Sequence, residues 1–371
     1  MMVPKLRFNG FAIPWKKAQI GSILTIGSGR DYKHLAHGEV PVFGSGGLMT
    51  YVDAFLHDGE TVCIGRKGTI DKPFYYSGKI WTVDTLFFTH SFIKVLPKFI
   101  FNLFCNINWK EHNEASGVPS LSKSTIGKIE VFYPDLKEQS KIANFLASVD
   151  EKITSLNKQY NLLCQYKKGM MQKIFSQELR FKDREGKYFP KWESKKIGTF
   201  ISEYKCKTTK EDEWPVMTSS RSGLVLQSDY YGENRLTERS NIGFNIIPQG
   251  YLTYRSRSDD GLFFFNQNRL NTTGCISVYY PVFNFKYGSN YFYNTMFNYY
   301  KNSFRAYAVG SSQLVLSITD LKAMKFMIPN PDEQMKISEF LSSIDKRIDK
   351  TKSIIDKLKT WKQGLLQQMF V

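Results

Sequence analysis

The sequence predicts an α+β protein in which two strand-rich globular domains alternate with two long helices that pair as an antiparallel coiled coil. Three observations predict this class. A helical segment recurs 195 residues further along the chain, and both globular segments open on the same short pattern. Their interiors consist of short apolar runs between glycine-rich turns. With 371 residues, the chain is long enough for two or three separate cores.

The charge is strongly basic, and its distribution indicates the kind of partner. The chain has 51 Lys and Arg against 34 Asp and Glu, a formal net charge of +17. Residues 1–134 hold 15 basic against 10 acidic groups, and residues 177–330 hold 21 against 14. Folded basic segments favour a shaped polyanion such as duplex DNA. No run of about 18 apolar residues occurs and the start lacks a secretory pattern, so we expect a soluble, cytoplasmic protein.

The repeat covers residues 134–153 and 329–348, which agree at ten of twenty positions. Both copies contain Glu-Gln-x-Lys-Ile-x-x-Phe-Leu-x-Ser-x-Asp, beginning at Glu138 and at Glu333. A proline precedes the Glu-Gln pair in each copy, and proline starts a helix well but cannot continue one. Both copies are therefore predicted to be helical.

Apolar residues follow at seven-residue spacing in both copies. The first series is Ile142, Val149, Leu156, Leu163 and Met170, and the second is Ile337, Ile344, Thr351, Leu358 and Leu365, broken only at Thr351. Such spacing over about 40 residues indicates a helix of roughly 60 Å that pairs with another. We expect the helix–helix interface to contain Ile142, Phe145, Leu146, Val149, Ile153, Ile337, Phe340, Leu341, Ile344 and Ile348.

The globular segments begin alike and then diverge. Trp15 precedes Ile20-Gly21 by the same spacing as Trp192 precedes Ile197-Gly198, an offset of 177 residues. The predicted domains are residues 1–134, a spacer helix at 135–178, residues 179–329 and a second spacer helix at 330–371. We call the differing interiors of the two globular segments the first and the second insert. Within the inserts we predict strands at 40–43, 61–64, 251–254 and 274–280, and helices near 98–109 and 290–304.

This order of elements, with the duplicated helix signature, resembles the specificity subunit of type I restriction–modification enzymes. The strings Gly65-Arg-Lys-Gly-Thr-Ile70 and Trp81-Thr-Val-Asp-Thr85 fit the same family. The resemblance implies that each globular segment is a target-recognition domain reading one half of a split double-stranded DNA site. The helices would act as spacers and would dock two methyltransferase subunits, to which restriction/translocase subunits can add.

The resemblance also divides the chemistry among subunits. It implies that partner subunits methylate adenine and restrict DNA, and that they hold S-adenosylmethionine, ATP and Mg. This chain would carry no catalytic residue, cofactor or metal. Because the two inserts differ, the target would be asymmetric.

Candidate DNA contacts are basic, amide and hydroxyl side chains in or near glycine-rich turns. Lysine supplies a point charge to a phosphate, whereas Arg, Asn and Gln offer paired donors or acceptors to base edges. The candidates in the first insert are Ser28, Arg30, Arg66, Lys67 and Lys72, and those in the second are Arg221, Arg255, Arg257, Gln267, Asn268 and Arg269. The Arg255 and Arg257 pair is expected on one face of a strand.

Two other functions stay open at this point. Asp183, Glu193 and Lys195 imitate a nuclease pattern, although we place them in a charged linker rather than on a strand pair. A coiled-coil scaffold whose globular domains bind protein is the third alternative. The aromatic run at 279–300 fits a packed helix better than a base-stacking platform.

Overall fold

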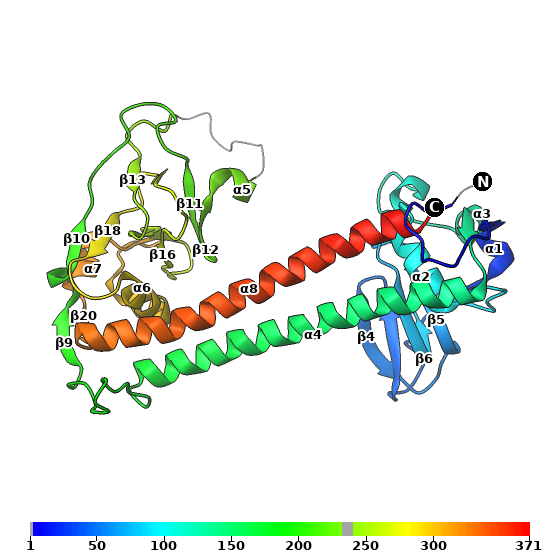
Figure 1. Ribbon diagram of the computed structural model, residues 1–371, viewed down its shortest axis with the longest axis horizontal. Helices are drawn as coiled ribbons and strands as arrows, with labels where there is room; N and C mark the ends of the chain where they lie inside the picture. Colours follow the sequence, from blue (N-terminus) through cyan, green and yellow to red (C-terminus); the bar gives the residue numbers. More distant parts are fainter. Residues whose placement is uncertain (1–2, 232–239) are drawn as a thin grey trace. The chain divides into compact units, whose positions relative to one another are not determined.

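The computed structural model describes residues 3–231 and 240–371 of the chain. The chain divides into two compact units: unit 1 comprises residues 1–159 and 351–371, and unit 2 comprises residues 160–350 (Figure 1). This division cuts through both long helices, so each unit contains the beginning of one and the end of the other. The domain limits given above follow the helix ends instead, and they remain a prediction.

A small frame of strands and helices is built twice, once in each unit. In unit 1, β1 (Lys16–Gln19) pairs antiparallel with β8 (Glu130–Tyr133), and in unit 2, β9 (Glu193–Lys196) pairs with β20 (Lys325–Ile328). The registers are equivalent, because the first residue of β1 or β9 lies opposite the last residue of β8 or β20. The sequence repeat is thus a repeat in structure.

A short helix precedes the second frame strand in each unit and begins in the same way. These helices are α3 (Lys123–Lys128) and α7 (Ile318–Ala323). The hydroxyl of the preceding serine, Ser122 or Ser317, accepts a hydrogen bond of 3.1 Å from the backbone N–H three residues later. Such N-caps satisfy donors that a helix start leaves unpaired.

The insert of unit 1 contains a single six-stranded sheet. Its strand order is β2 (Thr25–Ser28), β7 (Leu86–His90), β5 (His57–Gly65), β6 (Phe74–Thr82), β3 (Val40–Gly44) and β4 (Gly47–Val52), antiparallel except between β6 and β3. The helix α2 (Pro97–Asn106) packs on β5 and β6. The short α1 (Ile20–Ile23) and η1 (Trp109–His112) complete this unit. The predicted strands at 40–43 and 61–64 and the helix near 98–109 are confirmed.

The insert of unit 2 is built differently. A four-stranded sheet has the order β10 (Ile201–Glu203), β18 (Val282–Phe285), β14 (Leu252–Tyr254) and β16 (Phe265–Gln267). Three two-stranded ladders join β11 (Met217–Ser220) to β12 (Gly223–Leu226), β13 (Asn245–Ile247) to β17 (Gly274–Ile276), and β15 (Arg257–Ser258) to β19 (Leu314–Val315). The remaining elements are η2 (Ile197–Thr199), α5 (Gln227–Tyr231), α6 (Asn290–Tyr299) and η3 (Lys301–Tyr307).

Two expectations for unit 2 are settled by this arrangement. The predicted strand at 274–280 was too long: β17 ends at Ile276, and the backbone N–H of Tyr280 then bonds to the carbonyl of Ser277 at 2.9 Å, closing a turn. The aromatic run is a packed helix, as predicted, because α6 buries Phe292, Tyr293 and Phe297 completely. These rings are therefore not available to stack on bases.

The long helices are α4 (Leu136–Phe175), of 40 residues, and α8 (Pro331–Met369), of 39 residues. In unit 1 the beginning of α4 lies beside the end of α8, and Lys362 bonds to the carboxylate of Asp150 at 2.6 Å (Figure 1). In unit 2 the beginning of α8 lies beside the end of α4, and Lys167 bonds to Asp345 at 2.5 Å. The expected antiparallel pairing is confirmed.

The apolar stripe packs on the globular cores as well as on the other helix. Ile142 and Leu146 are buried in the core of unit 1, together with Leu365 from α8 and Phe370, which directly follows α8. Val149 is buried, Ile153 is half-buried, and the ring of Phe145 lies edge-on to Trp361 with centroids 6.0 Å apart.

The second copy of the stripe behaves alike. Ile337, Leu341 and Ile344 are buried in the core of unit 2 with Ile174 and Phe175 from α4. Phe340 and Ile348 pack at the edge of that core, and the ring of Phe340 lies 5.7 Å from that of Phe181. The stripe is thus a joint between each helix and its globular domain.

The Glu-Gln signature holds each domain to its helix. Glu138 is 1% exposed and accepts two hydrogen bonds from Arg7, of 2.6 and 2.7 Å. The amide of Gln139 accepts from the backbone N–H of Leu96 and donates to the carbonyl of Lys94, which fixes the loop before α2. Unit 2 repeats the ion pair with Glu333 and Arg180, at 2.7 and 2.9 Å.

None of the helices in the described ranges is long and apolar enough to cross a membrane.

Candidate nucleic-acid interface

A basic loop follows β5 in unit 1 and contains Arg66 and Lys67. Glycines on both sides shape this loop: a Cβ at Gly65 would lie 2.1 Å from the carbonyl oxygen of Thr69, and Gly68 has a φ of +83°. The backbone N–H of Arg66 bonds to the carbonyl of Thr85, and its carbonyl accepts from Leu121. The backbone is therefore fixed, while both side chains are exposed.

This loop borders a cavity of about 350 Å³ in unit 1. Three of the five residues predicted in the first insert meet here. The lining is Ser28, Arg66, Lys67, Phe87, Glu114, Ser120, Leu121, Ser122 and Lys123. Glu114 accepts from the Thr125 hydroxyl and from the backbone N–H of Ser122, and hydrogen bonds from Thr125 first and from Ser122 second lower its pKa. Three cations and hydroxyl groups thus surround a site with one acidic group.

The other two predicted residues of unit 1 lie outside this lining. Arg30 has an exposed side chain, while its carbonyl oxygen accepts from the indole of Trp81 at 2.9 Å. Lys72 is exposed in the segment between β5 and β6. Their roles stay predictions.

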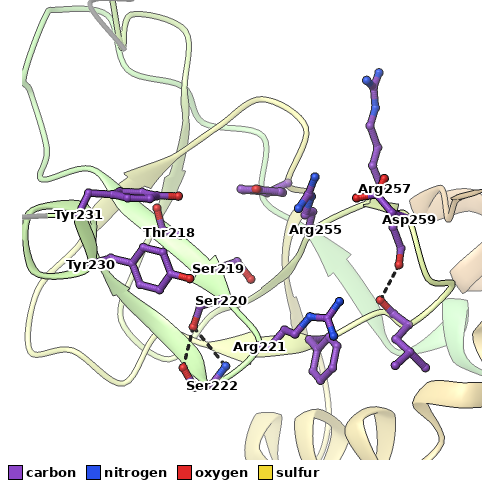
Figure 2. A pocket seen from close by; sticks show the side chains of 14 residues that line it. Thr218, Ser219, Ser220, Arg221, Ser222, Tyr230, Tyr231, Arg255, Arg257 and Asp259 are labelled. Carbon is purple, nitrogen blue, oxygen red and sulfur yellow. Dashed lines mark hydrogen bonds between the residues drawn. The ribbon is translucent and has the colours of Figure 1, made fainter. Parts of the chain in front are cut away.

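Unit 2 contains a larger cavity, of about 470 Å³, shown in Figure 2. Three predicted arginines, Arg221, Arg255 and Arg257, line it together. The other lining residues are Thr218, Ser219, Ser220, Ser222, Tyr230, Tyr231, Ser258, Asp259, Leu262, Phe264 and Tyr280. Cations, hydroxyl groups and aromatic rings are the side chains that contact phosphates and base edges.

The prediction that Arg255 and Arg257 share one strand face was wrong. The strand β14 ends at Tyr254, and Arg257 begins β15, so Arg255 lies on the bend between two strands. A bend forms because Tyr254 is fully buried, with its hydroxyl bonded to the carbonyl of Leu316 at 3.0 Å, while Arg255 is exposed. Both arginines still reach the same cavity, and the guanidinium of Arg257 lies 4.5 Å from the ring centre of Tyr279.

A second cavity of unit 2, of about 350 Å³, lies between β16 and the two long helices. Gln267, Arg269 and Arg221 line it, together with Lys167 and Asp345. Asp345 is 15% exposed and accepts from Lys167 and from the hydroxyl of Tyr291 at 2.8 Å. Arg269 lies 3.4 Å from the same carboxylate and stacks on Tyr291, so this arginine is engaged with α8.

The prediction that Asn268 contacts DNA is contradicted by its burial. The side chain is 1% exposed and donates to the carbonyls of Ile247 and Thr272, both at 3.0 Å. It also accepts from the backbone N–H of Leu270. Asn268 therefore closes the turn after β16. Gln267 is half-buried and donates to the carbonyl of Gly250.

The nuclease-like residues do not form a site. Contrary to our placement of them in a linker, Glu193 and Lys195 lie on β9, paired with β20. They form an exposed ion pair of 2.8 Å, whereas the Asp183 carboxylate accepts from the backbone N–H groups of Glu185 and Lys187. In the described part of the chain, no group of three or more His, Cys, Asp or Glu side chains could hold a metal ion.

Several lining residues were missed by sequence reasoning. The sequence around Tyr230 and Phe264 does not distinguish an aromatic side chain that lines a cavity from one that is buried in the core. Asp260, which lies outside this lining but bonds to Arg221 at 2.6 Å, was also missed, because the two residues are 39 positions apart. Lys123 lies in the first turn of α3 and was not singled out, since a lysine at a helix start has no distinctive spacing.

The chain is similar to known proteins along most of its length. The family model described as the type I restriction modification DNA specificity domain matches residues 13–164 and again residues 190–360. The chain is 26% identical over 348 residues to the type I restriction enzyme MjaVIII specificity subunit of Methanocaldococcus jannaschii, covering 84% of this chain and 77% of that protein. It is 24% identical over 167 residues to the type I restriction enzyme EcoprrI specificity subunit of Escherichia coli, covering 41% and 40% respectively.

A solved structure shares the fold. The crystal structure of the type I restriction–modification system S subunit from M. genitalium matches with a TM-score of 0.66 at 16% identity, covering 100% of this chain and 99% of that one.

Proposed function

This chain belongs to the type I restriction–modification DNA specificity family, and from that premise we propose that it reads a bipartite, asymmetric duplex DNA target for catalytic partner subunits. A specificity subunit recognises DNA sequence and is itself non-catalytic. The finer proposal concerns which groups read the DNA, what sets the gap between the half-sites, and which partners act there.

One observation carries the proposal: two unlike basic cavities stand on two copies of the same frame. The cavity of unit 1 has Arg66 and Lys67 on a loop after a long strand, whereas that of unit 2 has Arg221 and Arg255 on a hairpin and a bend. Equivalent frames with different cavities fit two half-sites of different sequence. The target is therefore asymmetric rather than palindromic.

The long helices support a fixed gap between the half-sites. Both α4 and α8 run without a break through the boundary between the compact units, at residues 159/160 and 350/351. A continuous 40-residue helix extends for about 60 Å, and we propose that this length sets the gap between the half-sites. One turn of DNA is about 34–36 Å, which is shorter than such a helix. Two half-sites one turn apart are therefore compatible with this length.

The duplicated frame also fits the expected partners. Two equivalent surfaces in one chain bind two copies of one protein, and we propose that these are methyltransferase subunits. S-adenosylmethionine, ATP and Mg would be bound by the methyltransferase and restriction subunits, which methylate adenine and cleave DNA. Flipping and methylating a base needs a pocket for that base on the methyltransferase.

Binding-site selection from a randomised duplex library tests the proposal with the full-length chain. We expect two half-sites of unlike sequence at a fixed gap. R66A should relax one half-site and leave the other intact, while R184A, an exposed arginine on the segment after α4, should change neither. Affinity should fall steeply between about 50 and 200 mM salt, because each neutralised phosphate releases counterions. A palindromic motif, or binding indifferent to salt, would contradict the proposal.

Mapping of methylated adenines tests the role of the partners. A host that expresses this chain with its methyltransferase should carry N6-methyladenine at the selected motif. The same host with the chain deleted should lose the modification at that motif. Persistence of the modification after deletion would show that another subunit supplies the address.

A further inference from the structure

We propose that Arg221 selects a guanine in the half-site read by unit 2, and that Asp260 is the residue that positions it. This inference rests on the proposed function and adds a base identity and a positioning device to it. Three features carry the inference: the hairpin that presents Arg221, the carboxylate that holds it, and the difference between Arg221 and the two other arginines of the cavity.

Arg221 occupies the tip of a tight hairpin between β11 and β12. Ser220 pairs with Gly223 across this tip, and Gly223 has a φ of +144°, a conformation that other residues rarely adopt. The hydroxyl of Ser220 donates to the carbonyl of Gly223 at 2.8 Å and accepts from the backbone N–H of Ser222. A short turn with its own hydrogen bonds holds the side chain at a defined place, and that side chain is 70% exposed.

Asp260 fixes one edge of the guanidinium. Its Oδ2 accepts from Nη2 of Arg221 at 2.6 Å. Its Oδ1 accepts from the backbone N–H of Leu262 at 3.1 Å and from the hydroxyl of Ser258 at 2.9 Å. Hydrogen bonds from Leu262, Ser258 and Arg221 lower the pKa of Asp260 to about 2. The carboxylate is thus charged and itself held when it contacts Arg221.

An aromatic ring supports the guanidinium from another side. The centre of the Phe264 ring lies 5.4 Å from the guanidinium carbon of Arg221, within the range of a cation–π contact. Arginine has five N–H donors. Only Nη2 has a hydrogen-bond partner within residues 3–231 and 240–371, which leaves four donors for a ligand.

The two other arginines of the cavity are held differently. Arg257 stacks on Tyr279, and Arg255 is exposed on its bend; in the described part of the chain neither bonds to a carboxylate. A side chain that is already fixed loses less conformational entropy on binding. Arg221 is therefore the arginine of this cavity best suited to a directional contact, and Arg255 and Arg257 suit phosphates.

Guanine is the base that matches such a group. In the major groove guanine presents two neighbouring acceptors, O6 and N7, which take two parallel N–H donors from one arginine. Adenine presents one acceptor and one donor, so it offers the same group only half of the contact. Lysine has the charge but no planar pair of donors.

The test is a selection from a randomised duplex library, made with the full-length chain and with R221A, R221K, D260N and R184A. The wild-type motif should contain a guanine in one half-site that R221A and R221K no longer select, with all other positions retained. We expect discrimination against adenine at that position to fall about tenfold or more. D260N should weaken the preference at the same position, and R184A should leave the motif unchanged. Thermal melting checks that each variant is folded.

Each other outcome overturns this inference. A motif unchanged in R221A, or a uniform loss of affinity for all sequences, would make Arg221 a non-reading residue or a phosphate contact. An R221K variant that still selects guanine would show that charge alone suffices. An unchanged motif in D260N would remove Asp260 from positioning. A wild-type chain that selects no motif would overturn the proposed function itself. That outcome differs from those above, in which the wild-type chain selects a motif and only the role of Arg221 or Asp260 is refuted.

Discussion

Lys167 of α4 bonds to Asp345 of α8 at 2.5 Å in unit 2, and the pair has a counterpart formed by the same two positions of the internal repeat. In unit 1 the lysine is Lys362, on α8, and the aspartate is Asp150, on α4. Each residue of one pair lies 195 positions from its equivalent in the other. The two helices therefore exchange roles between the units, as expected of an antiparallel pair built from a duplicated segment.

The Lys167–Asp345 pair should contribute more to stability than its counterpart. Asp345 accepts from Lys167 and Tyr291 and lies near Arg269, whereas Asp150 bonds to Lys362 alone among the described residues. A double-mutant cycle with K167A and D345A, followed by urea unfolding, should give a coupling energy of about 1–3 kcal/mol. The matched cycle with K362A and D150A should give a smaller value. Equal values would contradict the role of the added contacts.

The two buried Arg–Glu pairs should differ in a similar way. Glu333 accepts from Arg180 and from the indole of Trp192 at 3.0 Å, whereas the indole nitrogen of the equivalent Trp15 is buried without a partner in the described chain. E333Q leaves a buried arginine without its counter-ion and should cost about 3–5 kcal/mol. E138Q should cost about 1 kcal/mol less, because no indole bond is lost. Hydrogen exchange in each unit measures the loss of unfolding free energy that each variant causes. A larger loss from E138Q than from E333Q would refute this account.

A matched deletion in both helices tests their role in setting the gap. Removing residues 154–157 from α4 and the equivalent residues 349–352 from α8 shortens each helix by about 6 Å. Binding-site selection should then show a gap about two base pairs shorter, at about 3.4 Å per base pair. The deletion in α4 alone is the control, since it offsets Lys167 from Asp345 and should lower stability. An unchanged gap in the matched deletion would show that the helices do not set it.

Arg255 distinguishes base reading from phosphate contact. Its side chain is exposed and unpaired by any carboxylate of the described residues, so we expect R255A to weaken binding to all duplexes by a similar factor. The slope of log affinity against log salt concentration should decrease by about 1 in magnitude, which is the effect of losing one phosphate contact. Fluorescence anisotropy with cognate and scrambled duplexes measures both effects. A loss of about 1–3 kcal/mol confined to the cognate duplex would instead assign base reading to Arg255.

The selectivity that we assign to Arg221 should not depend on pH near neutrality. The pKa of Asp260 is lowered to about 2, so the carboxylate stays charged above that value, and its bond to Arg221 weakens only as the pH falls toward 2. The preference for guanine should therefore be the same at pH 8 and at pH 5. D260N should lack the full preference at both pH values. A preference that disappears by pH 5 in the wild-type chain would contradict this assignment.

The frame was predictable because its sequence pattern occurs twice in the chain. The repeat from Glu138 and from Glu333 indicated both long helices, and the structure confirms their antiparallel pairing. The function of the signature itself was not predictable, because Arg7 and Arg180 lie 131 and 153 residues from the glutamates that they bind. Only packing shows that Glu138 and Glu333 join each globular domain to its helix.

The candidate site was only partly predictable. Arg66, Lys67 and Arg221, chosen because they lie in glycine-rich turns, line cavities, since glycine marks backbone that turns sharply at the surface; their contact with DNA stays a prediction. The same reasoning failed for Asn268, since an amide in a turn serves the turn's own backbone as readily as a ligand. It also missed Asp260, because a loop partner of opposite charge has no fixed spacing in the sequence.

The duplicated plan, the two long helices and the basic character of both globular domains follow from the order of residues alone, because periodicity and charge are local properties of a chain. Only the tertiary structure decided which side chains meet. It brought Arg221 to Asp260, enclosed Asn268 and set Lys167 against Asp345, because long-range contacts depend on how strands and helices pack rather than on the order of residues.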